Sequence, residues 1–213
     1  MYVGRMVGVG KTKEGRNTAI YRISSRSFPN RSAIIAESGD SVAISSRDSS
    51  GRTTNPFINY TCVRKLSDWL VMSNGTHTDM IAERLEEGYS PQEAFTEILK
   101  EFGYEQDEHN TPRIAGIVPR EGDMGWLGVV RDDGMEVEEI ELKEGQLQYL
   151  ATYEHSSIRP EQRIVLERTD TTGIVEDLIQ SAEMNRFEYP VTAVAGVATD
   201  EDFELRTHDH SPS

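Results

Sequence analysis

Apolar residues recur along this chain in short runs, and many of the runs alternate with polar positions as β-strands with one buried face do. Residues 137–142, for example, place Val137, Ile140 and Leu142 among three glutamates, which indicates a sheet with one solvent-exposed face. The strands predicted in this way cover residues 2–9, 18–24, 33–36, 42–46, 55–63, 69–73, 114–118, 125–130, 137–142, 147–153 and 191–198.

Three stretches follow the helical period instead, with apolar residues three and four positions apart. In the clearest of them, Ser90 is placed as an N-cap, Glu93 completes a capping box and Gly103 ends the helix. The other two helices are predicted over residues 76–87, with Thr76 or Thr78 as the cap, and over residues 172–185.

The order of these elements predicts an α+β protein in which two sheets stack face to face and the helices cover their outer sides. At 213 residues the chain is long enough for one domain with its own core, which we place at residues 1–200. Residues 201–213 contain one weak strand and are predicted to fray as an acidic tail.

Neither a membrane span nor export is predicted, because no apolar run approaches ~18 residues and the first residues lack the pattern of a secretory signal. Cys62 is the only cysteine, which leaves no internal disulfide and no multi-cysteine metal site. His208 and His210 stand in the predicted tail, where a loose histidine pair is usually not a metal site. These features together predict a cytoplasmic protein.

The charge of the chain is unusual. Acidic residues outnumber basic ones by 37 to 22, which gives a net charge of −15, and only five of the 22 basic residues are lysines. Such a chain is not expected to bind a nucleic-acid backbone by general attraction. Scarce lysine with abundant Asp and Glu is typical of proteins from salt-loving archaea, although a merely acidic protein from an ordinary habitat shares this composition.

One stretch combines a strand end, a glycine turn and a helix start. The apolar residues 69–72 lead into Asn74 and Gly75, and the helix predicted from Thr76 follows. This arrangement points several backbone N–H groups at one spot, with the positive end of the helix dipole behind them. The three residues are therefore candidates for binding a polar or anionic group, although, taken alone, they fit an ordinary capped helix after a turn better.

A second candidate binding segment follows the strand predicted over residues 18–24. Arg22 and Arg26 are four residues apart, so they share a face if the strand continues. Arg31 follows in a serine-rich loop, and an arginine side chain offers phosphate two parallel N–H donors. The alternative is a solvated loop whose arginines pair with surface carboxylates.

Five segments resemble the archaeal IMP cyclohydrolase family, and the resemblance extends from residue 2 to about residue 200. The segments are Tyr2–Arg5, Tyr21–Arg31, Asn55–Tyr60, Ser73–Asp79 and Thr111–Ile114. The resemblance implies a four-layer αββα sandwich like the fold of the N-terminal nucleophile hydrolases. Residue 2 is Tyr rather than Ser, Thr or Cys, so the likeness concerns that fold and not its nucleophile.

The reaction implied by the resemblance is closure of 5-formamidoimidazole-4-carboxamide ribonucleotide to IMP with loss of water, the last step of de novo purine biosynthesis. The carboxamide nitrogen must attack the formyl carbon, so the nitrogen loses a proton while the formyl oxygen gains charge and needs a donor. The implied ligands are this ribonucleotide substrate and the IMP product. No metal and no other cofactor is implied for this cyclic-amidine hydrolase.

The resemblance also implies roles for individual residues. Tyr60 is the candidate for polarising the formyl group and donating a proton, and Glu105 is the candidate base or carboxamide-orienting group. The sequence leaves open which of the two is the acid. Substrate binding is assigned to Arg22, Arg26 and Arg31 for the phosphate, to Asn74, Gly75 and Thr76 for the base or formyl oxygen, and to Arg113, while Cys62 and His77 are taken as structural.

Two other functions fit parts of the same pattern. An amide hydrolase of the same fold would need a nucleophile at residue 2, where the chain has Tyr. A non-catalytic purine-nucleotide-binding protein would keep the arginines but would need neither Tyr60 nor Glu105. A homo-oligomer is compatible with the sequence, which predicts no membrane or nucleic-acid partner.

Overall fold

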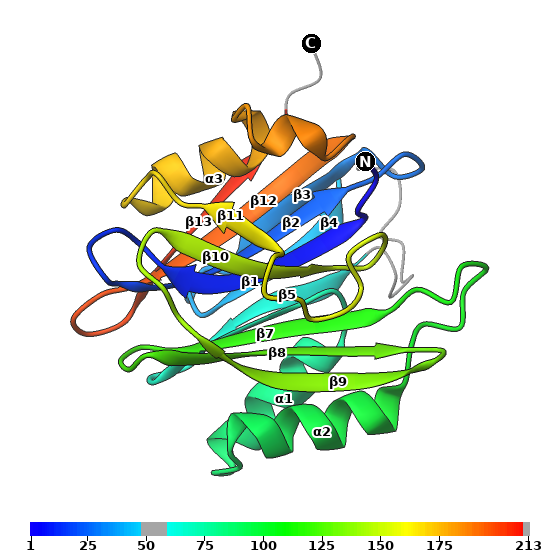
Figure 1. Cartoon of the computed structure of the whole chain (residues 1–213), viewed down its shortest axis with the longest axis horizontal. Coiled ribbons are helices and arrows are strands. Elements are labelled where there is room, and N and C mark those ends of the chain that lie inside the picture. Colours follow the sequence, from blue (N-terminus) through cyan, green and yellow to red (C-terminus); the bar gives the residue numbers. More distant parts are fainter. Residues whose placement is uncertain (48–58, 211–213) are drawn as a thin grey trace.

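Two antiparallel β-sheets lie face to face in the computed structural model, and helices cover both outer faces (Figure 1). The structure describes residues 1–47 and 59–210. Apolar side chains, among them Tyr21, Ile44 and Leu127, fill the space between the sheets. The prediction of a two-sheet α+β protein is thereby confirmed.

The first sheet has six strands in the order β11-β10-β1-β2-β12-β13. Its central strands are buried on both faces, because a helix packs on one side and the second sheet on the other. The strands are β1 (Arg5–Lys11), β2 (Asn17–Ser24), β10 (Gln146–Ala151), β11 (Arg163–Val165), β12 (Pro190–Ala198) and β13 (Phe203–Asp209).

The second sheet has seven strands, and each strand lies next to the one that follows it in the chain. The strands are β3 (Arg31–Ile35), β4 (Ser41–Ser46), β5 (Tyr60–Lys65), β6 (Trp69–Ser73), β7 (Arg113–Pro119), β8 (Met124–Arg131) and β9 (Gly134–Glu141). The edge strand β9 exposes Glu138, Glu139 and Glu141, as its alternation predicts. Charges on an edge strand discourage pairing with another chain.

Helices α1 (His77–Glu86) and α2 (Pro91–Phe102) pack on the second sheet, and α3 (Thr171–Gln180) packs on the first (Figure 1). The start of α2 is confirmed as predicted, because Ser90 Oγ accepts from Glu93 N at 3.3 Å and Glu93 Oε2 accepts from Ser90 N at 3.0 Å. Gly103 ends the helix at φ +60, a conformation that favours glycine. No helix in the described part of the chain is long and apolar enough to cross a membrane.

The boundaries of several elements differ from the prediction for local reasons. β1 begins at Arg5 rather than at residue 2, because Gly4 leaves the extended conformation at φ +68. α3 ends at Gln180 because Ser181 is extended, and a short 3-10 helix, η1 (Met184–Arg186), replaces its predicted last turn. Thr76 is the N-cap of α1, but its side chain makes no capping hydrogen bond.

The C-terminal segment is more ordered than its composition predicts. Phe203–Asp209 pairs along the length of β12 as strand β13, rather than fraying from residue 201. The apolar side chains Phe203 and Leu205 join the core between the sheets, which explains the pairing. Residues 211–213, and the part of the predicted strand 55–63 before residue 59, lie outside the described residues.

Candidate active site

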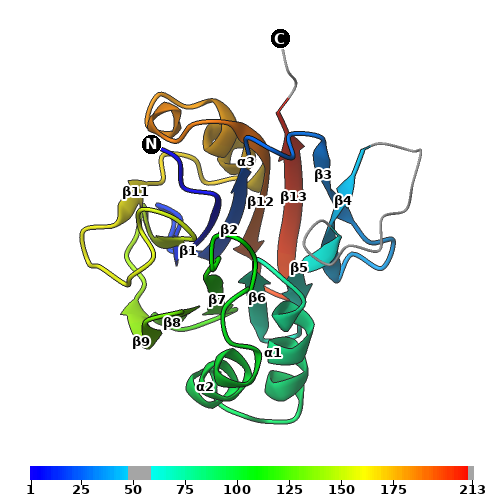
Figure 2. The same ribbon diagram turned by 90° about the vertical axis from the view of Figure 1, so that its right-hand side faces the viewer.

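A cleft of about 870 Å³ opens at the end of the sheets where β1 begins and β2 ends. Figure 2 looks onto this end of the molecule, where the connection from α2 to β7 lies beneath the N-terminal residues. Four segments of the chain line the cleft, within residues 2–5, 25–31, 105–109 and 153–154. All four are connections or strand ends, so the two sheets act as the rigid frame that brings them together.

Two arginines in the cleft, the buried Arg31 and the partly buried Arg5, each have a buried side-chain nitrogen without a hydrogen-bond partner. Arg31 is 2% exposed, and its Nε and Nη2 donate to Phe28 O and Ser25 Oγ, each at 3.2 Å, while its Nη1 has no partner. The Nε of Arg5 is buried and unpartnered as well. In the part of the chain that the structure describes, no carboxylate forms an ion pair with either arginine. Burial lowers the pKa of Arg31, which reflects the cost of an unpaired buried charge and indicates a site for an anion.

Glu105 lies in the same cleft and is 4% exposed. The connection that carries it is closed by a hydrogen bond from Glu105 N to Thr111 O at 2.8 Å, and its Oε1 lies 3.4 Å from Arg113 Nη1. Burial raises the pKa of Glu105, while the charges of Arg5 and Arg113 oppose the rise. A carboxylate with a raised pKa in a cleft is suited to accepting a proton near neutral pH.

Tyr60 begins β5 in the second sheet and is 5% exposed. Its hydroxyl oxygen lies 2.6 Å from that of Tyr21, which stands on β2 in the first sheet. Burial raises the pKa of Tyr60, and the charges of Arg5 and Arg31 act in the opposite direction. Tyr60 is therefore close to the two unpaired arginines, although it does not itself line the cleft.

Aromatic rings surround Arg26 at the rim of the cleft. The Arg26 guanidinium carbon lies 4.5 Å from the ring centre of Tyr2 and 5.2 Å from that of Tyr189. Its Nη2 is 3.4 Å from Glu188 Oε2, and Tyr2 also stacks on Tyr153 at 5.6 Å. The rim thus offers a cation held between flat apolar surfaces.

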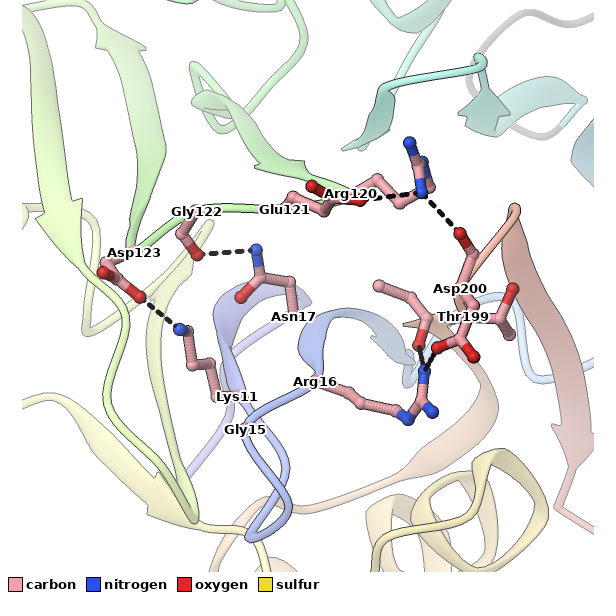
Figure 3. A pocket seen from close by; sticks show the side chains of 11 residues that line it. Lys11, Gly15, Arg16, Asn17, Arg120, Glu121, Gly122, Asp123, Thr199 and Asp200 are labelled. Carbon is pink, nitrogen blue, oxygen red and sulfur yellow. Dashed lines mark hydrogen bonds and ion pairs between the residues drawn. The ribbon is translucent and has the colours of Figure 1, made fainter.

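A second hollow of about 280 Å³ lies at the opposite end of the sheets, between the ends of β1, β7 and β12 (Figure 3). Its cations all pair with carboxylates, Lys11 with Asp123 at 2.6 Å, Arg16 with Asp200 at 3.1 Å and Arg120 with Glu121 at 3.1 Å. The Nε of Arg120 is buried without a hydrogen-bond partner, but the charge of this guanidinium is paired. The hollow therefore lacks the unpaired charge of the cleft, and we place the candidate active site in the cleft.

Within the described residues, no group of three or more His, Cys, Asp or Glu side chains is arranged to hold a metal ion. The His208 ring lies 3.1 Å from the Gln180 side chain, and the backbone N of His210 donates to Val191 O at 2.9 Å. The lining of the cleft includes three guanidinium groups, two phenols and four carboxyl groups, those of Glu105, Asp107, Glu108 and Glu154. The guanidinium groups suit anion binding, and a buried carboxyl group such as that of Glu105 suits proton transfer.

Comparison with known proteins relates the chain to one family, described as IMP cyclohydrolase-like protein, whose profile matches residues 2–202. The chain belongs to the IMP cyclohydrolase-like family. Curated relatives named IMP cyclohydrolase are similar over almost their whole length. The protein of Methanothrix thermoacetophila is 40% identical over 209 residues, covering 98% of this chain and 99% of the relative. That of Methanocaldococcus jannaschii is 39% identical over 207 residues, covering 97% and 98%.

The structure does not bring Arg22 into the cleft of this IMP cyclohydrolase-like chain. Its side chain lies beneath α3, where Nε donates to Leu178 O at 2.8 Å, Nη1 to Ser24 Oγ at 2.5 Å and Nη2 to Phe187 O at 3.0 Å. The expectation that Arg22 and Arg26 share a face does not hold, because β2 ends at Ser24 and its alternation stops there. Arg22 therefore fastens α3 and the following turn to the sheet.

The residues before α1 do not face the cleft either. Asn74 uses both ends of its amide, with Nδ2 donating to Pro112 O at 2.9 Å and Oδ1 accepting from Ile114 N at 2.8 Å. Asn74 thus links the end of β6 to the start of β7 through both ends of its side-chain amide. Neither Gly75 nor the exposed Thr76 lines the cleft.

The candidate site therefore contains part of the predicted set and one further cation. The structure gathers Arg26, Arg31 and Glu105 in the cleft and places Tyr60 and Arg113 close by. The sequence analysis missed Arg5. Its position as a charged residue at the start of an otherwise apolar strand could have indicated it. The segment 55–58 of the family resemblance lies outside the described residues.

Proposed function

We propose that this chain is an IMP cyclohydrolase, which closes 5-formamidoimidazole-4-carboxamide ribonucleotide to IMP with loss of water. Membership of the IMP cyclohydrolase-like family and full-length relatives with that name support the activity. The structural observation that carries the proposal is the cleft in which Arg5 and Arg31 lie unpaired beside a buried Glu105. We place the enzyme in the cytoplasm, as a step of purine biosynthesis.

The arginines of the cleft supply the positive charge that the ribonucleotide requires. The substrate brings a phosphate, and its formyl oxygen becomes negative as the ring closes. Arg31 offers this charge from a buried position and Arg5 from a partly buried one, and Arg26 offers it at the rim. Binding the nucleotide would give Arg31 and Arg5 the anionic partners that they lack within the described part of the protein.

Glu105 and Tyr60 divide the proton transfers between them in this proposal. The Glu105 carboxylate accepts a proton from the carboxamide nitrogen, which then attacks the formyl carbon. Tyr60 keeps its proton at neutral pH, because burial raises its pKa, and donates it to the formyl oxygen, which becomes a hydroxyl group. Glu105 then returns its proton to this hydroxyl, which leaves as water, while the Tyr60 phenolate takes the proton of the formamido nitrogen as the carbon–nitrogen double bond forms. Both side chains end in their starting protonation states. The nitrogen–carbon bond that forms and the carbon–oxygen bond that breaks leave IMP and one water molecule.

The layer order of the fold supports a relationship with the N-terminal nucleophile hydrolases without their chemistry. The helix, sheet, sheet and helix layers follow the order expected of that fold. Residue 2 is Tyr, and its ring stacks on Tyr153 at the rim of the cleft. A phenol in this position does not take the place of the usual hydroxyl or thiol nucleophile, so amide hydrolysis is the weaker candidate.

Incubating the pure protein with the formamido ribonucleotide and following IMP by chromatography tests the proposal. Wild-type protein should produce IMP, and Glu105→Gln should bind IMP but turn over at least about 10²-fold more slowly. The matched control is Glu101→Gln, the same change at the exposed end of α2, which should keep full activity. Nucleotide binding without turnover by the wild-type protein would instead identify a binding protein.

A further inference from the structure

Tyr153 is held in one position at the rim of the cleft. Its ring stacks on that of Tyr2, with ring centres 5.6 Å apart, and a Cβ added to Gly4 would lie 2.7 Å from its Cδ2. Its hydroxyl oxygen lies 2.9 Å from Thr111 Oγ1, and Thr111 is 0% exposed. The phenol is therefore fixed at its ring by packing and at its hydroxyl by a hydrogen bond to a buried residue.

The direction of this hydrogen bond follows from Asp107. Its Oδ2 accepts the Thr111 hydroxyl at 2.7 Å, and its Oδ1 accepts the backbone N–H groups of His109 at 3.1 Å and of Thr111 at 2.9 Å. Burial by itself would raise the pKa of Asp107, but these hydrogen bonds lower it, so the side chain is an ionised carboxylate that only accepts. The single hydroxyl proton of Thr111 is used on Asp107, and the Tyr153 hydroxyl must therefore donate to Thr111.

A phenol that donates its proton to the protein offers a ligand only the lone pairs of its oxygen. Among the residues that the structure describes, Thr111 is the one hydrogen-bond partner of the Tyr153 hydroxyl. Tyr153 and Asp107 both line the cleft, as Arg5 does. A guanidinium group only donates and suits the anionic part of a ligand, whereas a neutral acceptor such as this oxygen suits a part that carries a donor.

We infer that the Tyr153 hydroxyl oxygen is a specificity-determining acceptor, which binds a hydrogen-bond donor of the nucleotide, either a ribose hydroxyl or an N–H group of the base. Asp107 and Thr111 act through Tyr153 as positioning residues, because they fix the direction of its proton. The identity of the ligand rests on the proposed function, whereas the direction of the hydrogen bonds does not. A ligand group that can only accept is disfavoured at this position, since two acceptors would face each other.

The substitution Tyr153→Phe keeps the ring and removes the acceptor. In calorimetric titration it should bind IMP about three- to tenfold more weakly than wild type, the size expected for one lost hydrogen bond. The matched control is Tyr89→Phe, the same change on the exposed connection between α1 and α2, which should bind IMP as wild type does. Analogues of IMP without the 2′-hydroxyl, without the 3′-hydroxyl or with a methyl group on N1 identify the donor, because the analogue that lacks it should bind wild type and Tyr153→Phe equally.

The substitution Asp107→Asn tests the direction of the proton. The new amide must face the backbone N–H groups of His109 and Thr111 with its oxygen, so its nitrogen donates to Thr111 Oγ1. The Thr111 proton then turns to Tyr153, and the Tyr153 proton turns to the cleft. Removing a negative charge should by itself strengthen the binding of an anion. We nevertheless expect Asp107→Asn to bind IMP about threefold or more weakly, and Tyr153→Phe added to it should cause no further loss.

Equal binding of IMP by wild type and Tyr153→Phe would overturn the inference, as would a wild-type protein that does not bind IMP. It would also be overturned if all three analogues bound wild type better than Tyr153→Phe, or if Tyr153→Phe weakened binding further in the Asp107→Asn background. If Asp107→Asn does not fold, Tyr153→Phe and the analogues decide the question alone. Wild-type protein that binds IMP but does not form it from the formamido ribonucleotide would overturn only the proposed function.

Discussion

The hydroxyl oxygens of Tyr21 and Tyr60 lie 2.6 Å apart and connect the two sheets beside the cleft. Burial raises the pKa of Tyr21 well above its ordinary value, and burial raises the pKa of Tyr60 as well. Both phenols therefore carry their protons at neutral pH. In the proposed mechanism Tyr60 is therefore the proton donor, which leaves the role of base to Glu105.

Replacing Tyr60 by phenylalanine should lower kcat by about 10²-fold or more while the affinity for IMP changes little, since only the transferred proton is lost. Steady-state kinetics and calorimetric titration with IMP measure the two quantities. The control is Tyr149→Phe, because the hydroxyl of Tyr149 bonds to His155 at 2.8 Å and its ring packs in the core beneath α3. Near-full turnover by Tyr60→Phe would remove Tyr60 from the mechanism.

The acid limb of the pH profile of kcat/KM should lie above the ordinary pKa of a glutamate. Burial raises the pKa of Glu105, and the reactive form is the carboxylate, so activity falls as the pH drops through that raised value. Rates measured from acid to neutral pH at low substrate concentration give the limb. If the residual activity of the Glu105→Gln variant falls at the same acidic pH as that of wild type, a group other than Glu105 produces the acid limb.

Arg22 and Arg31 should respond in opposite ways to replacement by methionine. Arg22→Met leaves Leu178 O and Phe187 O without their charged donor and should destabilise the fold by about 2–4 kcal/mol, while the KM of the folded protein is unchanged. Arg31→Met removes a buried, unpaired charge, so it should leave the melting temperature near that of wild type and raise KM about tenfold or more. Denaturant unfolding gives the stability of each variant, and steady-state kinetics give its KM. A raised KM for Arg22→Met would contradict the prediction.

Salt should stabilise the protein if the acidic composition is a halophilic adaptation, as we propose. The net charge of −15 makes the acidic side chains repel one another in the folded state. Salt screens this repulsion, because the Debye length falls from about 30 Å at 0.01 M salt to about 3 Å at 1 M salt. Melting temperature and activity should both rise from dilute buffer to molar KCl, because the buried arginine contacts are screened less than the surface charges. A melting temperature that is flat or falls would remove the halophilic interpretation and leave the enzymatic one intact.

Local signals in the sequence were sufficient for most of the secondary structure. The capping box of Ser90 and Glu93 and the glycine at position 103 delimit α2 within a few residues, so they can be read without the rest of the chain. Alternation likewise marks the strands, because successive side chains of a strand point to opposite faces. β11 escaped prediction because three residues are too few to show a period.

The composition of the site depended on contacts between distant segments. Arg22 and Arg31 both lie close to the end of β2, yet all three side-chain nitrogens of Arg22 donate to protein oxygens. Arg31 lies in the cleft and leaves its Nη1 without a partner. Asn74 carries the amide expected of a ligand, but Pro112 and Ile114 use it. The sequence determined the elements and the supply of arginines, carboxylate and phenols, since these follow from neighbouring residues. Only the tertiary structure decided which of these groups remain unpaired at one place, because hydrogen-bond partners come from strands and helices that are far apart in the chain.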